Sequence, residues 1–331
     1  MIRRKFLHTG TAAVTASTFG ALTSAPAVHA AKVTQAPPMP KRPYGDTGEY
    51  LSIIGFPGIA VKNMEPEPAR KLVQDSVDAG VNYFDVAPSY GNAESVLGPA
   101  LEPHREKVFL ACKSQERMAG PLLAEMEQSF KLLRTDYFDL YQLHALQSAE
   151  DIQQIFGPDG AMEALTKARQ QGKIRYIGFS SHSVESAMAA LKYFEFNSVL
   201  FPVNYITWYN GNFGPQVVEY ARQRGAAVLA LKAMARTRIQ KGEERSYPNC
   251  WYHPLPDESE ISDGLRFTLS QPVTAAVVSG DASLFRLALK LAPALLPLSN
   301  NELHALERKA HGVAPIFTYP SDRFDVRKMK G

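Results

Sequence analysis

Four ionisable side chains stand at or just after the ends of short apolar segments, at spacings that suit proton transfer. Asp85 and Tyr90 belong to Phe84-Asp85-Val86-Ala87-Pro88-Ser89-Tyr90-Gly91, Lys113 ends Phe109-Leu110-Ala111-Cys112-Lys113, and His144 ends Leu140-Tyr141-Gln142-Leu143-His144. A neighbouring ammonium favours the ionised form of a phenol, so we expect Lys113 to lower the pKa of Tyr90 from about 10. Asp85 would hold that ammonium, and neutral His144 would orient a substrate oxygen. The set predicts a proton donor aimed at a carbonyl group.

Protonating a carbonyl is productive only when a nucleophile reaches its carbon atom. No side-chain nucleophile is evident near these residues, and no Ser-His-Asp context is found, so the pattern points to hydride from a reduced nicotinamide. The eight histidines show no metal-ligand spacing, and Cys112 and Cys250 are too few for a thiolate zinc site. We therefore expect no metal.

The fold must bring these residues to one place. Short apolar runs alternate with stretches of helical period from residue 52 onward, as in repeated βα units. The expected strands are 52–58, 82–87, 108–113, 137–144, 174–181, 198–205, 227–233 and 275–280. Eight such units predict an α/β fold, a single (β/α)8 TIM barrel over residues 44–331, whose strands carry their reactive groups at the carboxyl ends. A doubly wound open sheet is the alternative, but Gly55-Phe56-Pro57-Gly58 does not fit its glycine-rich turn.

Three segments depart from the βα pattern. Residues 44–50 predict an N-terminal β-hairpin that closes the bottom of the barrel. Residues 236–259 are longer than an ordinary βα loop and predict a lid or binding loop. Residues 300–312 predict an extra C-terminal helix.

In order and context, Asp85, Tyr90, Lys113 and His144 resemble the catalytic tetrad of the aldo-keto reductase family, and the similarity runs over residues 42–292. Gly172-Lys173-Ile174-Arg175-Tyr176-Ile177-Gly178-Phe179-Ser180-Ser181 is similar to the fifth-strand signature of that family. The resemblance implies NAD(P)H-dependent reduction of an aldehyde or ketone to an alcohol, or the reverse, with Tyr90 as general acid. The alternative from another class is a non-catalytic nicotinamide-binding redox sensor or accessory subunit.

The cofactor residues are expected in the loops after the seventh and eighth strands, where barrels of this kind bind phosphate. The candidates are Lys232, Arg236, Arg238, Lys241, Ser279, Gly280 and Arg286, with Ser180, Ser181 and Asn204 nearer the nicotinamide. By the resemblance, Arg286 would reach the 2′-phosphate or the adenine of NADP or NAD. The resemblance slightly favours NADP. Asp281 stands where a neutral hydroxyl is frequent in the family and would repel a 2′-phosphate, which leaves NAD open. Leu231 and Leu200 replace an aromatic ring and a glutamine that are common there.

Aromatic residues on the loops are candidates for the substrate pocket. Phe56, Trp208 and Trp251, with Tyr209 and Tyr252, would build an apolar or sugar-stacking surface for a small carbonyl substrate. His182, one residue beyond Ser181, is a further candidate for lining the pocket, although we expect it merely to begin the next loop.

The N-terminal residues predict a destination for the chain. The formal net charge is +3, and residues 1–30 hold Arg3, Arg4 and Lys5 without an acidic residue. The remaining charges are mixed in sign, so no nucleic-acid partner is expected. Residues 1–30 resemble a twin-arginine signal peptide with cleavage near Ala30 or Ala31, which implies the twin-arginine machinery and export to the periplasm. Residues 31–43 predict a linker, and no other segment is apolar enough for an integral membrane span.

Overall fold

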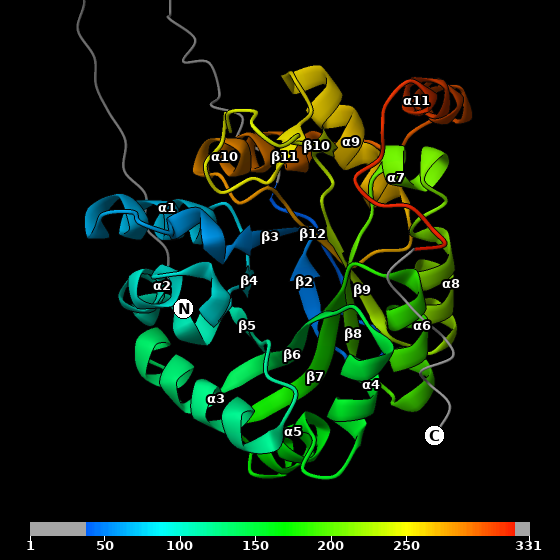
Figure 1. Ribbon diagram of the computed structural model, residues 1–331. Helices are drawn as coiled ribbons and strands as arrows, with labels where there is room; N and C mark the ends of the chain where they lie inside the picture. The colour runs from blue at the N-terminus through cyan, green and yellow to red at the C-terminus, as the bar shows by residue number, and fades with distance from the viewer. Residues whose placement is uncertain (1–37, 322–331) are drawn as a thin grey trace, which may run out of the picture. The chain divides into compact units, whose positions relative to one another are not determined.

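Eight parallel strands form a closed barrel in the computed structural model, which describes residues 38–321 (Figure 1). The barrel strands are β3 (Ile54–Pro57), β4 (Tyr83–Asp85), β5 (Phe109–Ser114), β6 (Phe138–Leu146), β7 (Ile174–Ser181), β8 (Ser198–Pro202), β9 (Ala227–Leu231) and β12 (Ala275–Val277). Each strand pairs with the next along the chain, and β12 pairs with β3 to close the ring. Six of the eight lie within the predicted segments, β5 and β6 extend one and two residues beyond theirs, and the (β/α)8 barrel is confirmed.

Helices follow the strands and cover the outside of the barrel (Figure 1). They are α1 (Pro66–Asp78), α2 (Ala93–Leu101), α3 (Ala119–Leu133), α4 (Ala149–Phe156), α5 (Ala161–Gln170), α6 (Val184–Tyr193), α7 (Tyr205–Asn210), α8 (Pro215–Gln223), α9 (Glu258–Ser270), α10 (Ala282–Leu291) and α11 (Asn300–His311). Short 3-10 turns are η1 (Gly58–Val61), η2 (Pro88–Tyr90), η3 (Glu102–Lys107) and η4 (Ala292–Ala294). Helix α11 is the expected extra C-terminal helix, and it packs on α7. No helix among residues 38–321 is both long and apolar enough to span a membrane.

An antiparallel hairpin closes the amino-terminal end of the barrel, as predicted. Its strands are β1 (Lys41–Pro43) and β2 (Tyr50–Ser52), and the turn between them buries Tyr44. The Tyr44 hydroxyl donates to Ser198 Oγ at 2.8 Å, and its ring packs edge-on against Phe109. Strand β1 takes up the last three residues of the stretch expected to be a linker, because their backbone pairs with β2. The predicted signal peptide lies outside the described residues.

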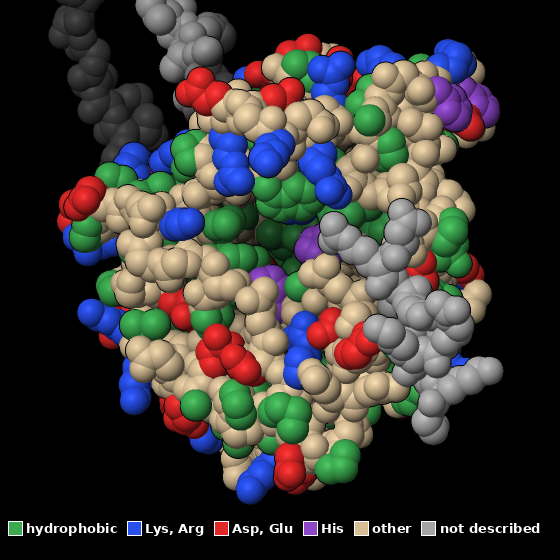
Figure 2. All heavy atoms as spheres, viewed as in Figure 1, with side chains coloured by type: hydrophobic (Ala, Val, Ile, Leu, Met, Phe, Trp, Pro, Cys, Tyr) green, Lys and Arg blue, Asp and Glu red, His purple; other side chains and the backbone are tan. Residues whose placement is uncertain are grey.

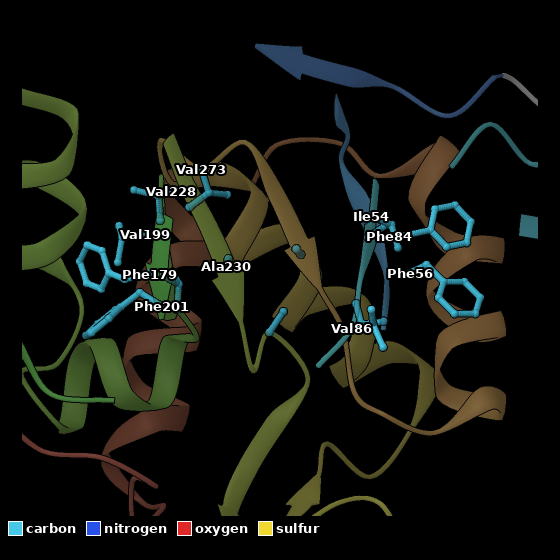
Figure 3. Packing of buried hydrophobic residues seen from close by; sticks show 14 of the residues in the cluster. Ile54, Phe56, Phe84, Val86, Phe179, Val199, Phe201, Val228, Ala230 and Val273 are labelled. Atoms are coloured by element: carbon cyan, nitrogen blue, oxygen red, sulfur yellow. The ribbon is translucent and has the colours of Figure 1, made fainter. Parts of the chain in front are cut away.

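Side-chain alternation along the strands separates two apolar layers. Phe56 and Phe84 point outward and stack on each other with ring centroids 4.7 Å apart, and Phe56 also meets Phe285 of α10. Figure 3 shows the rings of Phe56 and Phe84 beside the helix layer. On either side of Phe84, Tyr83 and Asp85 point into the barrel, because successive side chains of a strand face opposite sides of the sheet. This register places the carboxylate of Asp85 inside the barrel.

Two segments flank the carboxyl ends of the strands. The predicted lid after β9 contains a second hairpin, made by β10 (Ala235–Arg238) and β11 (Tyr252–Pro254). Residues 313–321 lie against it: Arg238 donates to the Ile316 carbonyl at 2.9 Å, and the Phe317 ring packs edge-on against Trp251. These contacts make the side wall of the site described next.

Candidate active site

A buried ion pair lies at the carboxyl ends of β4 and β5. Lys113 is 0% exposed and its Nζ donates to Asp85 Oδ1 and, at 3.2 Å, to the Val86 carbonyl. The second carboxylate oxygen accepts from Tyr83 and from Gln142 at 3.0 Å. Burial alone lowers the pKa of Lys113, but the Asp85 carboxylate outweighs burial and the pKa is raised. A fixed ammonium therefore persists inside the barrel.

Tyr90 lies beside that ammonium. It ends η2, which begins at Pro88 directly after β4, and the centroid of its ring is 5.0 Å from Lys113 Nζ. Burial raises the pKa of Tyr90, while Lys113 acts in the opposite direction. The expected net lowering is therefore wrong for this structure, because desolvation of the phenolate outweighs the ammonium. Tyr90 keeps its proton at neutral pH, as a proton donor must.

His144 completes this group at the end of β6. The rings of Tyr90 and His144 are perpendicular, with centroids 5.9 Å apart, and Ser89 Oγ is 3.3 Å from His144 Nδ1. Burial, with the charge of Lys113, lowers the pKa of His144 to about 2. Arg117 donates to the His144 carbonyl at 2.9 Å, which holds the end of the strand. The imidazole is thus neutral, as expected, and Nε2 is left for a ligand.

These four side chains share one cavity of about 490 Å³. Its apolar surface includes Leu200, Leu231 and Val277, and Trp251 and Tyr252 form part of its wall. Figure 2 shows the hollow, with histidine side chains in it and Lys and Arg side chains gathered above it. The structure thus brings together Asp85, Lys113, Tyr90 and His144 from three consecutive strands and the loop after β4.

His182 begins the loop after β7, as expected, and it also lines this cavity. It lies just after β7, and burial with the charge of Lys232 lowers its pKa to about 3. Its Nε2 is buried and has no hydrogen-bond partner among the described residues. A second cavity of about 720 Å³ adjoins the first and shares His144, His182, Gln115 and Trp251 with it.

The predicted cofactor residues divide into three groups. Ser180, Lys232 and Gly280 line the first cavity, whereas Arg236 and Arg286 are exposed on β10 and α10. Three others have structural partners: Ser181 Oγ donates to the Leu146 carbonyl at 2.6 Å, Asn204 Oδ1 accepts from Thr207 N–H at 3.0 Å to cap α7, and Ser279 Oγ accepts from the Tyr252 hydroxyl at 2.9 Å.

The aromatic candidates for the substrate pocket are only partly brought together. Trp251 lines both cavities. Phe56 is a wrong prediction, because strand alternation sends its ring outward into the core while its neighbour Pro57 faces the cavity. Trp208 on α7 packs edge-on against Phe267 at 5.8 Å and lines neither cavity. Burial on the helix layer, not loop position, decides where these two rings lie.

The sequence did not predict Tyr83 and Gln142 as site residues, although both donate a hydrogen bond to Asp85. The available signal was a polar group on the inward face of an apolar strand: Tyr83 lies two residues before Asp85, and Gln142 pairs in register with Lys113.

Cys112 and Cys250 are both buried and free. Residues 38–321 contain no group of three or more His, Cys, Asp or Glu side chains arranged to hold a metal.

Acid should destabilise the protein through the two neutral histidines. An unfolded histidine has a pKa near 6.5, whereas the folded values are about 2 for His144 and about 3 for His182. The unfolded state therefore binds more protons below pH 6.5. As the pH is lowered to 5, the free energy of unfolding decreases by about 2 kcal/mol for each of the two histidines. We expect the Tm of His182→Gln to drop less than that of the wild type between pH 7.5 and pH 5. Equal drops would contradict this account.

The comparisons with known proteins agree on one family. The model described as "Aldo/keto reductase family" matches residues 54–305. The uncharacterized oxidoreductase YqkF of Bacillus subtilis is 25% identical over 300 residues, which is 81% of this chain and 96% of that protein. The holo form of aldo-keto reductase AKR11C1 from Bacillus halodurans has the same fold, with a TM-score of 0.67, 22% identity and coverage of 86% of this chain and 99% of that one.

Other relatives align over shorter regions. The 6-dehydroglucose reductase of Novosphingobium aromaticivorans is 32% identical over 173 residues, 46% of this chain and 55% of that protein. Methylglyoxal reductase YeaE of Escherichia coli is 39% identical over 109 residues, 32% of this chain and 36% of that protein. This chain thus spans about half or less of the length of these two reductases in the alignments.

Proposed function

The chain belongs to the aldo/keto reductase family, and from that premise we propose that it reduces an aldehyde or ketone to an alcohol with Tyr90 as the general acid. Membership makes it an NAD(P)-dependent oxidoreductase. The proposed role of Tyr90 rests on one observation. Its protonated phenol shares a cavity with the paired ammonium of Lys113 and the neutral imidazole of His144.

Each of these groups has a separate task. His144 Nε2 would donate to the carbonyl oxygen, since Nδ1 faces Ser89. Tyr90 would pass its proton to that oxygen as negative charge develops, and the Lys113 ammonium would stabilise the phenolate left behind. Asp85, held by Tyr83 and Gln142, keeps Lys113 in place. A bound reduced nicotinamide supplies the hydride to the carbonyl carbon.

The residues present fit a nicotinamide cofactor. Leu200, Leu231 and Val277 offer an apolar surface to one face of a planar ring, near Tyr90. The Ser180 hydroxyl lines the same cavity, where a carboxamide would find a polar partner. Toward the phosphates, Gly280 lies at the start of α10, and Arg236, Lys241 and Arg286 are exposed cations on the two expected loops. We propose these groups as the cofactor-binding set.

Asp281 should bias the choice of nucleotide toward NADH. Its Oδ1 accepts from the backbone N–H groups of Ser283 at 2.8 Å and Leu284 at 3.3 Å, so a carboxylate already occupies the N-terminus of α10. A 2′-phosphate at that helix end would meet like charge. We expect Asp281→Ser to improve the Kd for NADPH relative to NADH by roughly tenfold, in fluorescence titrations. Asp257→Ser, at the N-terminus of α9, is the control; an unchanged ratio in Asp281→Ser would refute the bias.

Cofactor titration followed by a carbonyl panel tests the proposed function. Purified protein is titrated with NADPH and NADH by fluorescence, then assayed with aldehydes and ketones by the loss of absorbance at about 340 nm. We expect micromolar binding of one nucleotide and turnover of at least one carbonyl compound. Tight cofactor binding without turnover of any compound would favour the non-catalytic sensor or accessory subunit.

We also propose that the protein is exported folded to the periplasm. Arg3-Arg4-Lys5-Phe6-Leu7, the apolar stretch after it and the small residues up to Ala31 support this route. Replacing both Arg3 and Arg4 with lysine should leave the precursor in the cytoplasm, as judged by cell fractionation and N-terminal sequencing. Export of the double variant at the wild-type rate would exclude the twin-arginine machinery.

A further inference from the structure

Lys232 is a second cation in the catalytic cavity, and the proposed chemistry does not use it. It follows β9 directly with a φ of 65°, a left-handed conformation that is costly for a residue with a side chain. Its Nζ is 5.1 Å from the centroid of the Trp251 ring and 4.8 Å from that of Tyr252. No oxygen acceptor among residues 38–321 takes a hydrogen bond from it, unlike Lys113, which is paired with Asp85. An ammonium held between rings without an anion is available to a ligand.

The walls of the two joined cavities contain no acid to neutralise this charge. Among their lining residues the one carboxylate is Asp85, and Lys113 already pairs with it. A further cation, Arg238, lines the second cavity with its guanidinium carbon 5.9 Å from the centroid of the Trp251 ring. Its side chain donates to the Ile316 carbonyl and makes no ion pair among the described residues. Trp251 thus has Lys232 near its ring in the first cavity and Arg238 near its ring in the second.

Lys232 shares the wall of the catalytic cavity with the two buried imidazoles. It lines the same cavity as His144 and His182, and its charge contributes to the lowered pKa of both imidazoles. Burial lowers the pKa of Lys232 itself to about 8, so it remains mostly protonated at neutral pH. Two neutral hydrogen-bonding rings and an unpaired ammonium therefore surround the space into which a carbonyl group must enter.

We propose that Lys232 binds a carboxylate on the substrate, so that this enzyme reduces aldehydes or ketones that carry a carboxylate group. The inference rests on the proposed function and adds the substrate class to it. His144 and Tyr90 hold the carbonyl end, Lys232 holds the acid end, and Arg238 receives longer acids in the second cavity. An ion pair formed away from bulk water gives the discrimination between an acid and its neutral ester.

Matched pairs of substrates test this assignment. Glyoxylate, 4-oxobutanoate and 4-carboxybenzaldehyde are each compared with their methyl esters, at a concentration of reduced cofactor that saturates the variant under study. For the wild type we expect kcat/KM to favour at least one acid over its ester by roughly 10- to 100-fold, the range for a hydrogen bond between charged groups. In Lys232→Met this preference should disappear, mainly through a higher KM for the acid.

Two further variants make the result specific. Lys232→Arg keeps the charge and should retain most of the preference, whereas Lys192→Met, an exposed lysine on α6, should behave as the wild type. Equal kcat/KM for acids and esters in the wild type would overturn the inference while leaving the proposed function intact. So would a Lys232→Met variant that binds reduced cofactor at least tenfold more weakly but keeps the acid preference, because Lys232 would then serve the cofactor.

A binding measurement keeps the inference separate from the reductase activity. Calorimetric titration of the cofactor complex with 4-hydroxybutanoate, the alcohol product of 4-oxobutanoate, needs no turnover. We expect binding to the wild type and a loss of at least tenfold in affinity in Lys232→Met. If no carbonyl compound is reduced but this difference is found, the proposed function fails and the carboxylate site stands. Equal affinities of the two proteins would overturn the site.

Discussion

Tyr90→Phe is expected to lower kcat for aldehyde reduction by about 10²- to 10⁴-fold, the range for the loss of a general acid. The ring of Tyr90 stays in place against His144 and Lys113, so the cavity keeps its shape. The Kd for the reduced nucleotide should remain within about twofold, because the lost group serves the carbonyl oxygen and not the cofactor. Steady-state assays and fluorescence titration of the same preparation give both numbers.

Tyr50→Phe is the matched control for this result. Tyr50 is an exposed tyrosine on β2, at the opposite end of the barrel, and is 59% exposed. Its variant should turn over at the wild-type rate. A Tyr90→Phe enzyme that retains kcat within threefold of the wild type would mean that another group protonates the carbonyl.

Lys113→Met is expected to abolish activity and to destabilise the fold by about 3–5 kcal/mol, as when one partner of a buried ion pair is removed. Asp85 is 2% exposed, and its charge would be left with only the neutral donors Tyr83 and Gln142. Denaturant unfolding followed by circular dichroism measures the loss of stability.

The double variant Lys113→Met/Asp85→Asn separates folding from catalysis. The asparagine removes the unpaired buried charge, so most of the lost stability should return, while carbonyl reduction should remain absent because no ammonium stabilises the phenolate of Tyr90. A single Lys113→Met variant that is as stable as the double variant would show that the ion pair carries little of the folding energy.

The order of the strands and the position of the tetrad were accessible from sequence because both depend on local patterns. Short apolar runs separated by helical periods specify βα units, and Gly80 and Gly225 adopt the positive φ values of 90° and 70° that the helix ends require. Parallel strands bring their carboxyl ends to one rim, so Asp85, Lys113 and His144 had to meet once the barrel was recognised.

The direction in which individual side chains point was harder to predict from the sequence. Both faces of a barrel strand are apolar, so the sequence does not distinguish the outward Phe56 from the inward Pro57. The position of Lys232 depends on a left-handed backbone conformation that its residue type does not predict. Likewise the pKa of Tyr90 is raised because burial outweighs the opposing effect of the Lys113 ammonium, and the depth of burial is not evident from the sequence. Such quantities require the packed structure.

Single-turnover transfer of deuterium tests the central claim most directly, namely that the cavity of Tyr90 and His144 serves hydride transfer to a carbonyl carbon. Enzyme in excess of reduced nucleotide carrying deuterium at both positions of C4 of the nicotinamide is mixed with an aldehyde that the enzyme turns over. The account predicts an alcohol with one deuterium on its carbinol carbon, formed rapidly by the wild type and about 10²-fold or more slowly by Tyr90→Phe. An unlabelled alcohol, or equal rates for the two proteins, would contradict it.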